Sequence, residues 1–309
     1  MNPAPNAEPL AGPGTGVIIE RILCPVDFSE ASVKAYRYAQ SVAGRYRATL
    51  VVQHVVELQK HPSGFYSASW QLFEEFRRKL IADGQHDLQQ LANSSGGIRA
   101  ECIVQEGLAA DAILSLAQER AVSLIVMGTH GSRGIDHLTM GSVTEKVLRK
   151  AHCPVLAVRK PAHESTAQTA VPHLVEVHRI VCCTDFSEPS GQAWEHAVSL
   201  AAEYRAELAL LHVLDDISGL SDIEKDTREA LERVQKQTSP WAHKNVMIKP
   251  VVRIGKAYQQ IIQLALESQA DLIVMGVRGR HALDLAVFGS TTYRVVQLGP
   301  CPVLVVHFD

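Results

Sequence analysis

Short runs of Val, Ile and Leu alternate along the chain with longer segments whose apolar residues recur at helical spacing. In the first half these runs end at Asp27, at Met127 and at Val158, and another spans 49–56. Runs that are apolar on both faces are typical of parallel strands buried between helices. Helical patterns separate them, the longest at 29–46. The alternation predicts an α/β fold in which helices cover both faces of an open parallel sheet.

This alternating pattern occurs twice. The segment Ile22–Glu30 returns as Ile180–Glu188, 158 residues later, with Asp-Phe-Ser-Glu unchanged. Gly107 and Gly255 are 148 residues apart, so the first half carries ten more residues (158 − 148) between Val55 and Gly107. A repeat of this length is a duplicated domain and not a short solenoid unit. Two domains also agree with 309 residues, which exceed the usual size of one hydrophobic core.

Two segments without a periodic pattern predict the domain limits. Residues 1–16 are rich in Pro, Gly and Ala, and we expect them to form a disordered tail. Residues 161–177 hold Pro, His, Ser and Thr, and we expect them to be the linker. The two domains are then 17–160 and 178–309.

Composition limits the classes of partner. With 46% hydrophobic and 20% charged residues, the composition is that of an ordinary soluble globular protein. The net charge of −3 provides no electrostatic basis for binding nucleic acid or an anionic membrane. We find no secretory signal and no apolar run long enough to span a membrane. Six cysteines without a C-x-x-C pair, and scattered histidines, indicate reduced thiols without a metal site in a cytoplasmic protein.

A glycine-rich segment follows the fourth strand of each half. Gly128 and Gly131 are followed, after nine residues, by Gly141-Ser142, and the second half repeats this spacing from Gly276. Glycines let backbone N–H groups approach an anion, and the next helix adds the positive end of its dipole. The serine hydroxyl can donate one more hydrogen bond. The pattern therefore favours phosphate binding; the alternative is a tight turn with the serine as helix N-cap.

An aspartate ends the first strand of each half, at Asp27 and Asp185. Ligands of open parallel sheets bind beyond the carboxyl ends of the strands, where the strand order reverses. If strands one and four are neighbours there, the carboxylate faces the glycine loop and can accept hydrogen bonds from a ribose or a base. The alternative is a helix N-cap, because Glu30 and Glu188 stand three residues on, as in a capping box. The two roles are compatible.

The chemistry around the loop favours binding over catalysis. No Gly-Lys-Ser/Thr follows the glycines, so the loop is not a Walker A motif, and Lys146 is a weak substitute. A triphosphate would need Mg²⁺ and nearby arginines, for which the candidates are Arg133 in the first half and Arg278 and Arg280 in the second. No residue is placed to activate water. We expect slow hydrolysis or none.

A helical stripe of aromatic residues distinguishes the first half. Trp70, Phe73 and Phe76 recur at steps of three within 65–80. Packing within the chain is the ordinary explanation, and a partner or lid surface is the alternative. The matching segment of the second half, 221–236, is dominated by charges and predicts a solvated helix.

From about residue 17 to 309 the chain resembles a tandem universal stress protein of the ATP-binding type. The resemblance rests on the two glycine segments described above, on Pro25–Ser29, and on the Leu-x-x-x-His-Val pattern at Leu50–Val55 and Leu208–Val213. It implies two domains, each with a five-stranded parallel sheet of order 3-2-1-4-5. It also implies that the last strands of the two domains pair as an internal pseudo-dimer, with a homodimer and a regulatory protein partner as further options.

The resemblance also implies the ligand contacts. Asp27 and Asp185 would contact the ribose or adenine of ATP, and the backbone of Val55 and Val213 would hold the adenine. The residues expected at the phosphates are Met127, Gly128, Gly131, Gly141, Ser142 and Val143, and then Met275, Gly276, Gly279, Gly289, Ser290 and Thr291. The second half departs from the first at Cys183-Thr184, which replaces Pro25-Val26, and at Arg278 and Arg280 in its loop.

Three classes of function follow. The first is a stress-response regulatory protein that binds ATP with Mg²⁺ in both domains and hydrolyses little or none of it. The second is a slow ATPase or phosphotransferase. The third is a dimerisation scaffold that binds no nucleotide. The missing Walker lysine and the missing base favour the first.

Overall fold

The computed structural model describes residues 16–58, 67–93, 98–130, 140–159, 175–214, 222–241, 246–277 and 289–307, and all structural statements below concern these residues. Most of the expected tail and linker, 1–15 and 160–174, lies outside them. The domain limits at 17–160 and 178–309 therefore stay predictions.

Both halves contain the same succession of elements. The first half consists of β1 (Arg21–Pro25), α1 (Glu30–Tyr46), β2 (Thr49–Val56), α2 (Ser67–Asn93), β3 (Ala100–Glu106), α3 (Ala109–Glu119), β4 (Leu124–Gly128), α4 (Ser142–Lys150) and β5 (Val155–Val158). The second half consists of β6 (Arg179–Thr184), α5 (Glu188–Tyr204), β7 (Glu207–Leu214), α6 (Ile223–Thr238), a 3₁₀ turn at Ser239–Trp241, β8 (Ile248–Ile254), α7 (Ala257–Glu267), β9 (Leu272–Gly276), α8 (Ser290–Leu298) and β10 (Val303–Val306). The predicted alternation of strands and helices is confirmed.

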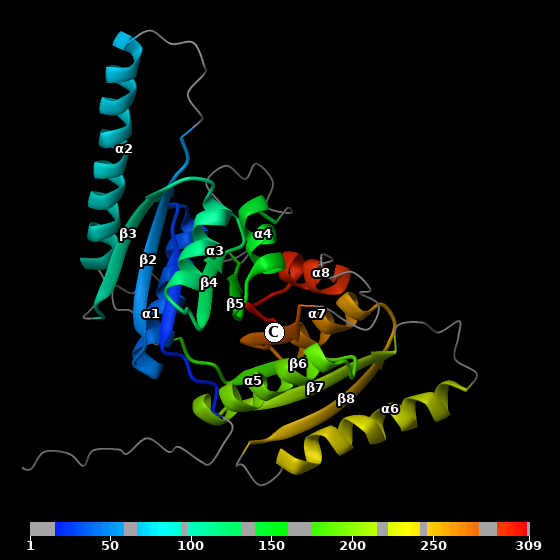
Figure 1. Cartoon of the computed structure of the whole chain (residues 1–309). Coiled ribbons are helices and arrows are strands. Elements are labelled where there is room, and N and C mark those ends of the chain that lie inside the picture. Colours follow the sequence, from blue (N-terminus) through cyan, green and yellow to red (C-terminus); the bar gives the residue numbers. More distant parts are fainter. Residues whose placement is uncertain are drawn as a thin grey trace, which may run out of the picture.

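The strands form one ten-stranded sheet with the order β3-β2-β1-β4-β5-β10-β9-β6-β7-β8 (Figure 1). Within each half every pair is parallel, and the predicted order 3-2-1-4-5 is confirmed twice. The two halves join through β5 and β10, which pair antiparallel with Leu156 opposite Leu304.

Helices cover both faces of the sheet. One core lies under α1, α2, α5 and α6, and the other lies under α3, α4, α7 and α8. Buried alanines recur every fourth residue of α1, at Ala31, Ala35, Ala39 and Ala43. Because residues four apart share a helix face, these small side chains let α1 lie close to the strands. No helix among the described residues is long and apolar enough to span a membrane.

The start of α1 corrects one expectation. The N-cap is Ser29, whose hydroxyl accepts a hydrogen bond from the Ser32 amide, and Ser187 does the same in α5. Asp27 lies two residues before the cap, and Glu30 is the first residue of the helix. The capping box expected between Asp27 and Glu30, and its copy in the second half, are therefore wrong.

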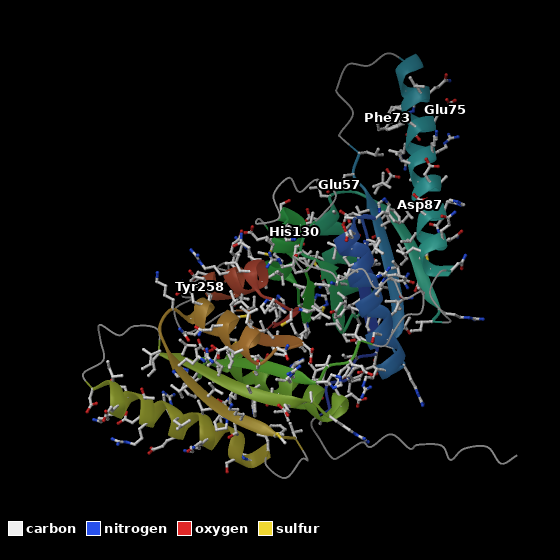
Figure 2. All side chains as sticks on the ribbon, turned by 180° about the vertical axis from the view of Figure 1, so that it is seen from behind. Glu57, Phe73, Glu75, Asp87, His130 and Tyr258 are labelled. Carbon is white, nitrogen blue, oxygen red and sulfur yellow. The ribbon has the colours of Figure 1, made fainter. Side chains whose placement is uncertain are left out.

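The aromatic stripe lies on α2, whose first turns extend beyond the ends of β2 and β3 (Figures 1 and 2). Trp70 and Phe76 are 53% and 55% exposed, and Leu72 is 69% exposed. Phe73 is half-buried, with its ring centroid 6.1 Å from that of Trp70. The expectation that the stripe packs within the chain is thus wrong for Trp70 and Phe76, and a partner surface stays a hypothesis.

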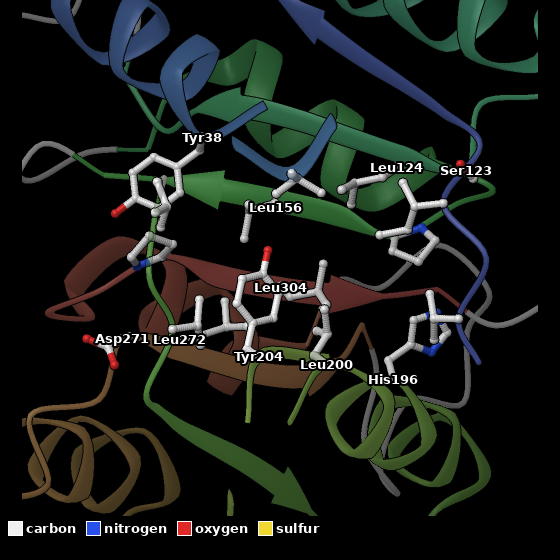
Figure 3. A pocket seen from close by; sticks show the side chains of 17 residues that line it. Tyr38, Ser123, Leu124, Leu156, His196, Leu200, Tyr204, Asp271, Leu272 and Leu304 are labelled. Atoms are coloured by element: carbon white, nitrogen blue, oxygen red, sulfur yellow. The ribbon is translucent and has the colours of Figure 1, made fainter. Parts of the chain in front are cut away.

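A small apolar cavity of about 60 Å³ lies beside the junction of the halves (Figure 3). Its walls come from matching positions of the two halves, for example Tyr38 and His196, which are 158 residues apart, and Leu124 and Leu272, which are 148 apart. The junction therefore surrounds an approximate two-fold axis that relates the two halves.

Candidate functional site

The strand order reverses between β1 and β4, which are neighbours although about 100 residues of chain separate them. The chain leaves β1 into α1 on one face of the sheet, and it leaves β4 towards α4 on the other face. The carboxyl ends of these two strands therefore lie between the starts of the two helices, at the position where open α/β sheets bind ligands. In the second half β6 and β9 are neighbours in the same way.

The turn after β1 holds Asp27 at this edge. Its carboxylate oxygen Oδ1 accepts hydrogen bonds from the Ser29 amide at 3.1 Å and the Ser29 hydroxyl at 2.5 Å. Phe28 has φ 60°, a left-handed conformation that bulky residues rarely adopt, and its ring lies 4.7 Å from that of His54. A ring nitrogen of His54 is 2.8 Å from the Val26 carbonyl oxygen. The turn is thus fixed on both sides of Asp27.

The second half repeats this turn. Asp185 accepts from the Ser187 amide at 3.0 Å and from its hydroxyl at 2.5 Å. Phe186 has φ 62° and lies 4.4 Å from the His212 ring. Backbone conformations of this kind concentrate at functional sites, so their recurrence in both halves supports a shared role for the turn.

The last residue of β4, Gly128, contacts the first turn of α1. A Cβ on Gly128 would lie 2.9 Å from the Ala31 carbonyl carbon and 3.0 Å from its oxygen, and a Cβ on Gly276 would lie 3.0 Å from the same atoms of Pro189. Only glycine permits this approach. The contact brings the Asp27 turn and the glycine loop to one place, and it gives Gly128 a packing role that the sequence pattern did not indicate.

The two ends of each glycine loop meet. The Gly141 amide donates to the Thr129 carbonyl at 2.9 Å, and the Thr129 amide donates to Val158 at 3.0 Å. In the second half the Gly289 amide donates to Val277 at 3.3 Å. The intervening segments, 131–139 and 278–288, lie outside the described residues, and with them lie four predicted site residues: Gly131, Arg133, Arg278 and Gly279.

The starts of α4 and α8 correct the assignment of the caps. The N-caps are Gly141 and Gly289, and neither helix has a side-chain hydrogen bond at its cap. Ser142 and Ser290 are the first helical residues, and both are exposed. The alternative in which these serines act as N-caps is therefore wrong. An N-terminus without a side-chain cap, next to an exposed hydroxyl, is suited to an anionic group.

Two threonines fix these helices to the strands. The Thr144 hydroxyl donates to the Gly128 carbonyl at 2.8 Å, and the Thr292 hydroxyl donates to the Gly276 carbonyl at 3.1 Å. Neither threonine was among the predicted site residues, and neither was Phe28 with its ring contact. Their recurrence at the offset of the duplication, 148 residues for the threonines, is the signal that could have revealed them.

The remaining predicted residues lie at the same edge. Met127 and Met275, next to the last residues of β4 and β9, are 4% and 5% exposed and belong to the core. Val55 and Val213 lie at the carboxyl ends of β2 and β7 and are half-buried, as are Val143 and Thr291 in the first turns of α4 and α8. Glu57 and His130, labelled in Figure 2, follow β2 and β4. In each half the predicted site residues that the structure describes thus lie at or just after the carboxyl ends of strands, or at the start of the following helix, and their role in binding stays a prediction.

The halves differ at a pair of side chains on β2 and β3, and at the equivalent positions on β7 and β8. Gln53 is fully buried, and its amide nitrogen donates to the Gln105 side chain at 2.6 Å, while its amide oxygen has no hydrogen-bond partner. Leu211 and Arg253 stand at the equivalent positions.

Lys146 of α4 forms an ion pair with Asp111, with Nζ 2.7 Å from the nearer carboxylate oxygen. Among the described residues no group of three or more His, Cys, Asp or Glu side chains could hold a metal ion.

These features define a class: a duplicated open α/β protein whose strand order reverses once in each half. The model of the universal stress protein family matches residues 19–159 and again 176–307. The chain belongs to the universal stress protein family, as its resemblance predicted, and it contains two copies of the family's unit.

Relatives and solved structures agree. A universal stress protein of Mycolicibacterium smegmatis is 26% identical over 298 residues, which are 93% of this chain and 96% of that protein. One of Methanocaldococcus jannaschii is 32% identical over 149 residues, 48% of this chain and 86% of that protein. The crystal structure of a universal stress protein from Archaeoglobus fulgidus has a TM-score of 0.66 at 23% identity and covers 95% of this chain and 98% of its own. The shared fold thus extends over both halves.

Proposed function

We propose that each half binds one adenine nucleotide, ATP together with Mg²⁺, where its strand order reverses. The observation that carries the proposal is the start of α4 and of α8, which in both halves combines a glycine N-cap, no side-chain cap and an exposed serine. Phosphate groups bind at such helix ends through backbone N–H groups and the positive end of the dipole.

The turn after the first strand of each half suits the ribose and base of a nucleotide. Asp27 and Asp185 supply a carboxylate that can accept hydrogen bonds from ribose hydroxyls, and the preference for adenine rests on the family resemblance. Mg²⁺ commonly keeps its waters and binds substrate phosphates with only one or two carboxylates. A site without a protein cage for a metal is compatible with this mode of binding.

We assign the protein a regulatory role in a stress response, with little or no hydrolysis. Lys146, in the second turn of α4, forms an ion pair with Asp111, so its charge is already partnered. A regulatory protein partner would receive the signal, and a homodimer is a further option. The six cysteines are all free thiols, which favours the reducing cytosol as the site of action.

Valine at the glycine N-caps tests the sites one at a time. Gly141 has φ −62° and ψ 141°, and Gly289 has φ −58° and ψ 130°, so valine can replace either without backbone strain while covering the first-turn amides. Calorimetric titration with Mg-ATP should give two sites for the wild type, one each for Gly141→Val and Gly289→Val, and none for the double variant. Turnover should stay below about 1 s⁻¹, the low end of ordinary enzymes.

Gly191→Val is the matched control, because a Cβ at Gly191 of α5 meets no atom within 4 Å. It should retain both sites. Unchanged ATP binding in the folded double variant would show that the nucleotide does not use these helix ends.

A further inference from the structure

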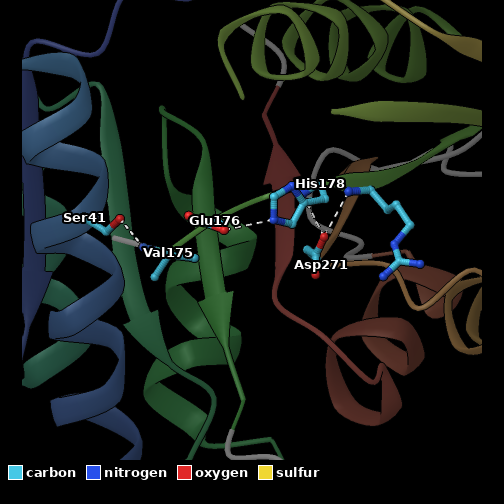
Figure 4. Close-up of polar contacts among 6 residues, drawn as sticks. Ser41, Val175, Glu176, His178 and Asp271 are labelled. Carbon is cyan, nitrogen blue, oxygen red and sulfur yellow. Dashed lines mark hydrogen bonds and ion pairs between the residues drawn. The ribbon is translucent and has the colours of Figure 1, made fainter. Parts of the chain in front are cut away.

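Several contacts across the junction of the two halves are reciprocal. The Val17 amide donates to the Ser199 hydroxyl of α5 at 2.8 Å. Figure 4 shows the counterpart, in which the Val175 amide donates to the Ser41 hydroxyl of α1 at 2.7 Å. Val17 and Val175 are equivalent positions, as are Ser41 and Ser199, each pair 158 residues apart. The segment before the first strand of each half thus crosses to the other half.

The antiparallel pairing of β5 and β10 is symmetric as well, since Leu156 and Leu304 face each other at equivalent positions, 148 residues apart. Contacts between identical residue types at equivalent positions would form equally well between two first halves or two second halves. They hold the junction together, but they do not decide which halves pair.

Other contacts do not follow this symmetry, among them Arg159 with the Gly299 carbonyl, His307 with the Leu148 carbonyl, and one ion pair. Arg45, at the end of α1, lies opposite Glu203, at the end of α5, with Nε 3.2 Å from Oε1. A second guanidinium nitrogen donates to the Glu203 carbonyl oxygen, and the guanidinium lies 4.4 Å from the centre of the Tyr204 ring. Positions 45 and 203 are equivalent, 158 residues apart, yet they carry opposite charges.

We propose that Arg45 and Glu203 make the junction selective, so that a first half pairs with a second half and not with the first half of another copy. Pairing of like halves through this surface would place arginine opposite arginine, or glutamate opposite glutamate. Pairing of unlike halves gives an attractive contact supported by a hydrogen bond and by the face of an aromatic ring. The partner that fits this surface is therefore the other half of the chain.

Exchange of the two charges tests this proposal on the full chain. The double variant Arg45→Glu/Glu203→Arg restores an ion pair with the two charges exchanged between the halves. Its new arginine at position 203 can contact Tyr46, which is equivalent to Tyr204. Each single variant, Arg45→Glu or Glu203→Arg, should lower the thermal midpoint by about 2–4 °C, since attraction becomes repulsion. The double variant should return to within about 1 °C of the wild type.

Salt and a control variant separate charge from packing. At about 1 M salt the screening length falls to about 3 Å, so the loss in each single variant should shrink. Arg37→Glu reverses a charge on the exposed side of the same helix and should leave the midpoint within about 1 °C of the wild type. Additive losses in the double variant, or losses that salt does not reduce, would overturn the proposal.

Discussion

At the scale of single residues, the duplication separates positions that serve the fold from positions available to a ligand. Gly128 and Gly276 both lie against the start of a helix, at distances that no side chain tolerates. Gly141 and Gly289 have ordinary backbone angles, so the backbone does not require glycine there. The second pair is therefore the better indicator of a ligand that needs the backbone exposed.

Gly128→Ala should destabilise the fold. Its Cβ would meet backbone atoms of Ala31 at 2.9–3.0 Å, and backbone cannot rotate away as a side chain can. Overpacking of this kind costs about 1–3 kcal/mol, which chemical denaturation would measure. Gly191→Ala, in an open helical position, should instead be neutral or stabilising by up to about 1 kcal/mol. Equal stability of Gly128→Ala and wild type would contradict the packing role.

His196 should make the junction sensitive to acid. It lines the cavity between the halves, and burial lowers its pKa below the usual value for histidine, about 6.5. The unfolded chain therefore binds the proton more readily, so stability is complete above about pH 6.5 and falls as the pH drops below it. His196→Tyr, which installs the residue found at Tyr38, should remove this part of the pH dependence of the thermal midpoint. If the thermal midpoints of the wild type and His196→Tyr changed with pH in the same way, this role of His196 would be refuted.

At the scale of elements, the sequence predicted the strands better than the helix starts. The runs at 49–56 and 155–158 coincide with β2 and β5, because period and apolar content identify buried strands well. Around α1, Asp27 and Ser29 are both good cap residues, and local pattern cannot choose between them. The left-handed conformation of Phe28 sets the choice, and it depends on the packing of that ring against His54.

The start of α4 depends on Thr144. Thr144→Val would leave the buried Gly128 carbonyl without the hydroxyl that donates to it, at a cost of about 1–3 kcal/mol. It would also release the helix end from β4, so ATP affinity of the first half should fall in the same titration. Thr144→Ser retains the hydroxyl and should keep most of both properties. Full affinity and stability in Thr144→Val would show that this bond does not position the helix.

At the scale of the whole molecule, the chain consists of two similar halves whose strands join in one sheet. The order of strands within each half followed from the resemblance, whereas the contact between Arg45 and Glu203 could not be predicted from the sequence. That contact depends on where the two-fold axis passes, which is set by the register of Leu156 against Leu304. The exposed Trp70 and Phe76 were likewise assigned to packing because periodicity does not show whether a helix extends beyond its sheet.

Duplication also allows the two sites to diverge while the scaffold stays common. Both candidate sites share the phenylalanine turn, the glycine N-cap and the threonine contact. The halves differ at Gln53 of β2 and Leu211 of β7, which are buried at equivalent positions. The shared features predict that both halves bind nucleotide, and the difference predicts unequal affinities.

The number of nucleotides bound by one wild-type chain tests the central claim most directly. Calorimetric titration of nucleotide-free protein with Mg-ATP should give two sites per chain, with unequal affinities for the two halves. Gly141→Val and Gly289→Val should then each remove a different one of them. A folded chain that binds no adenine nucleotide at all would contradict the account, because its paired helix ends would then serve the fold alone.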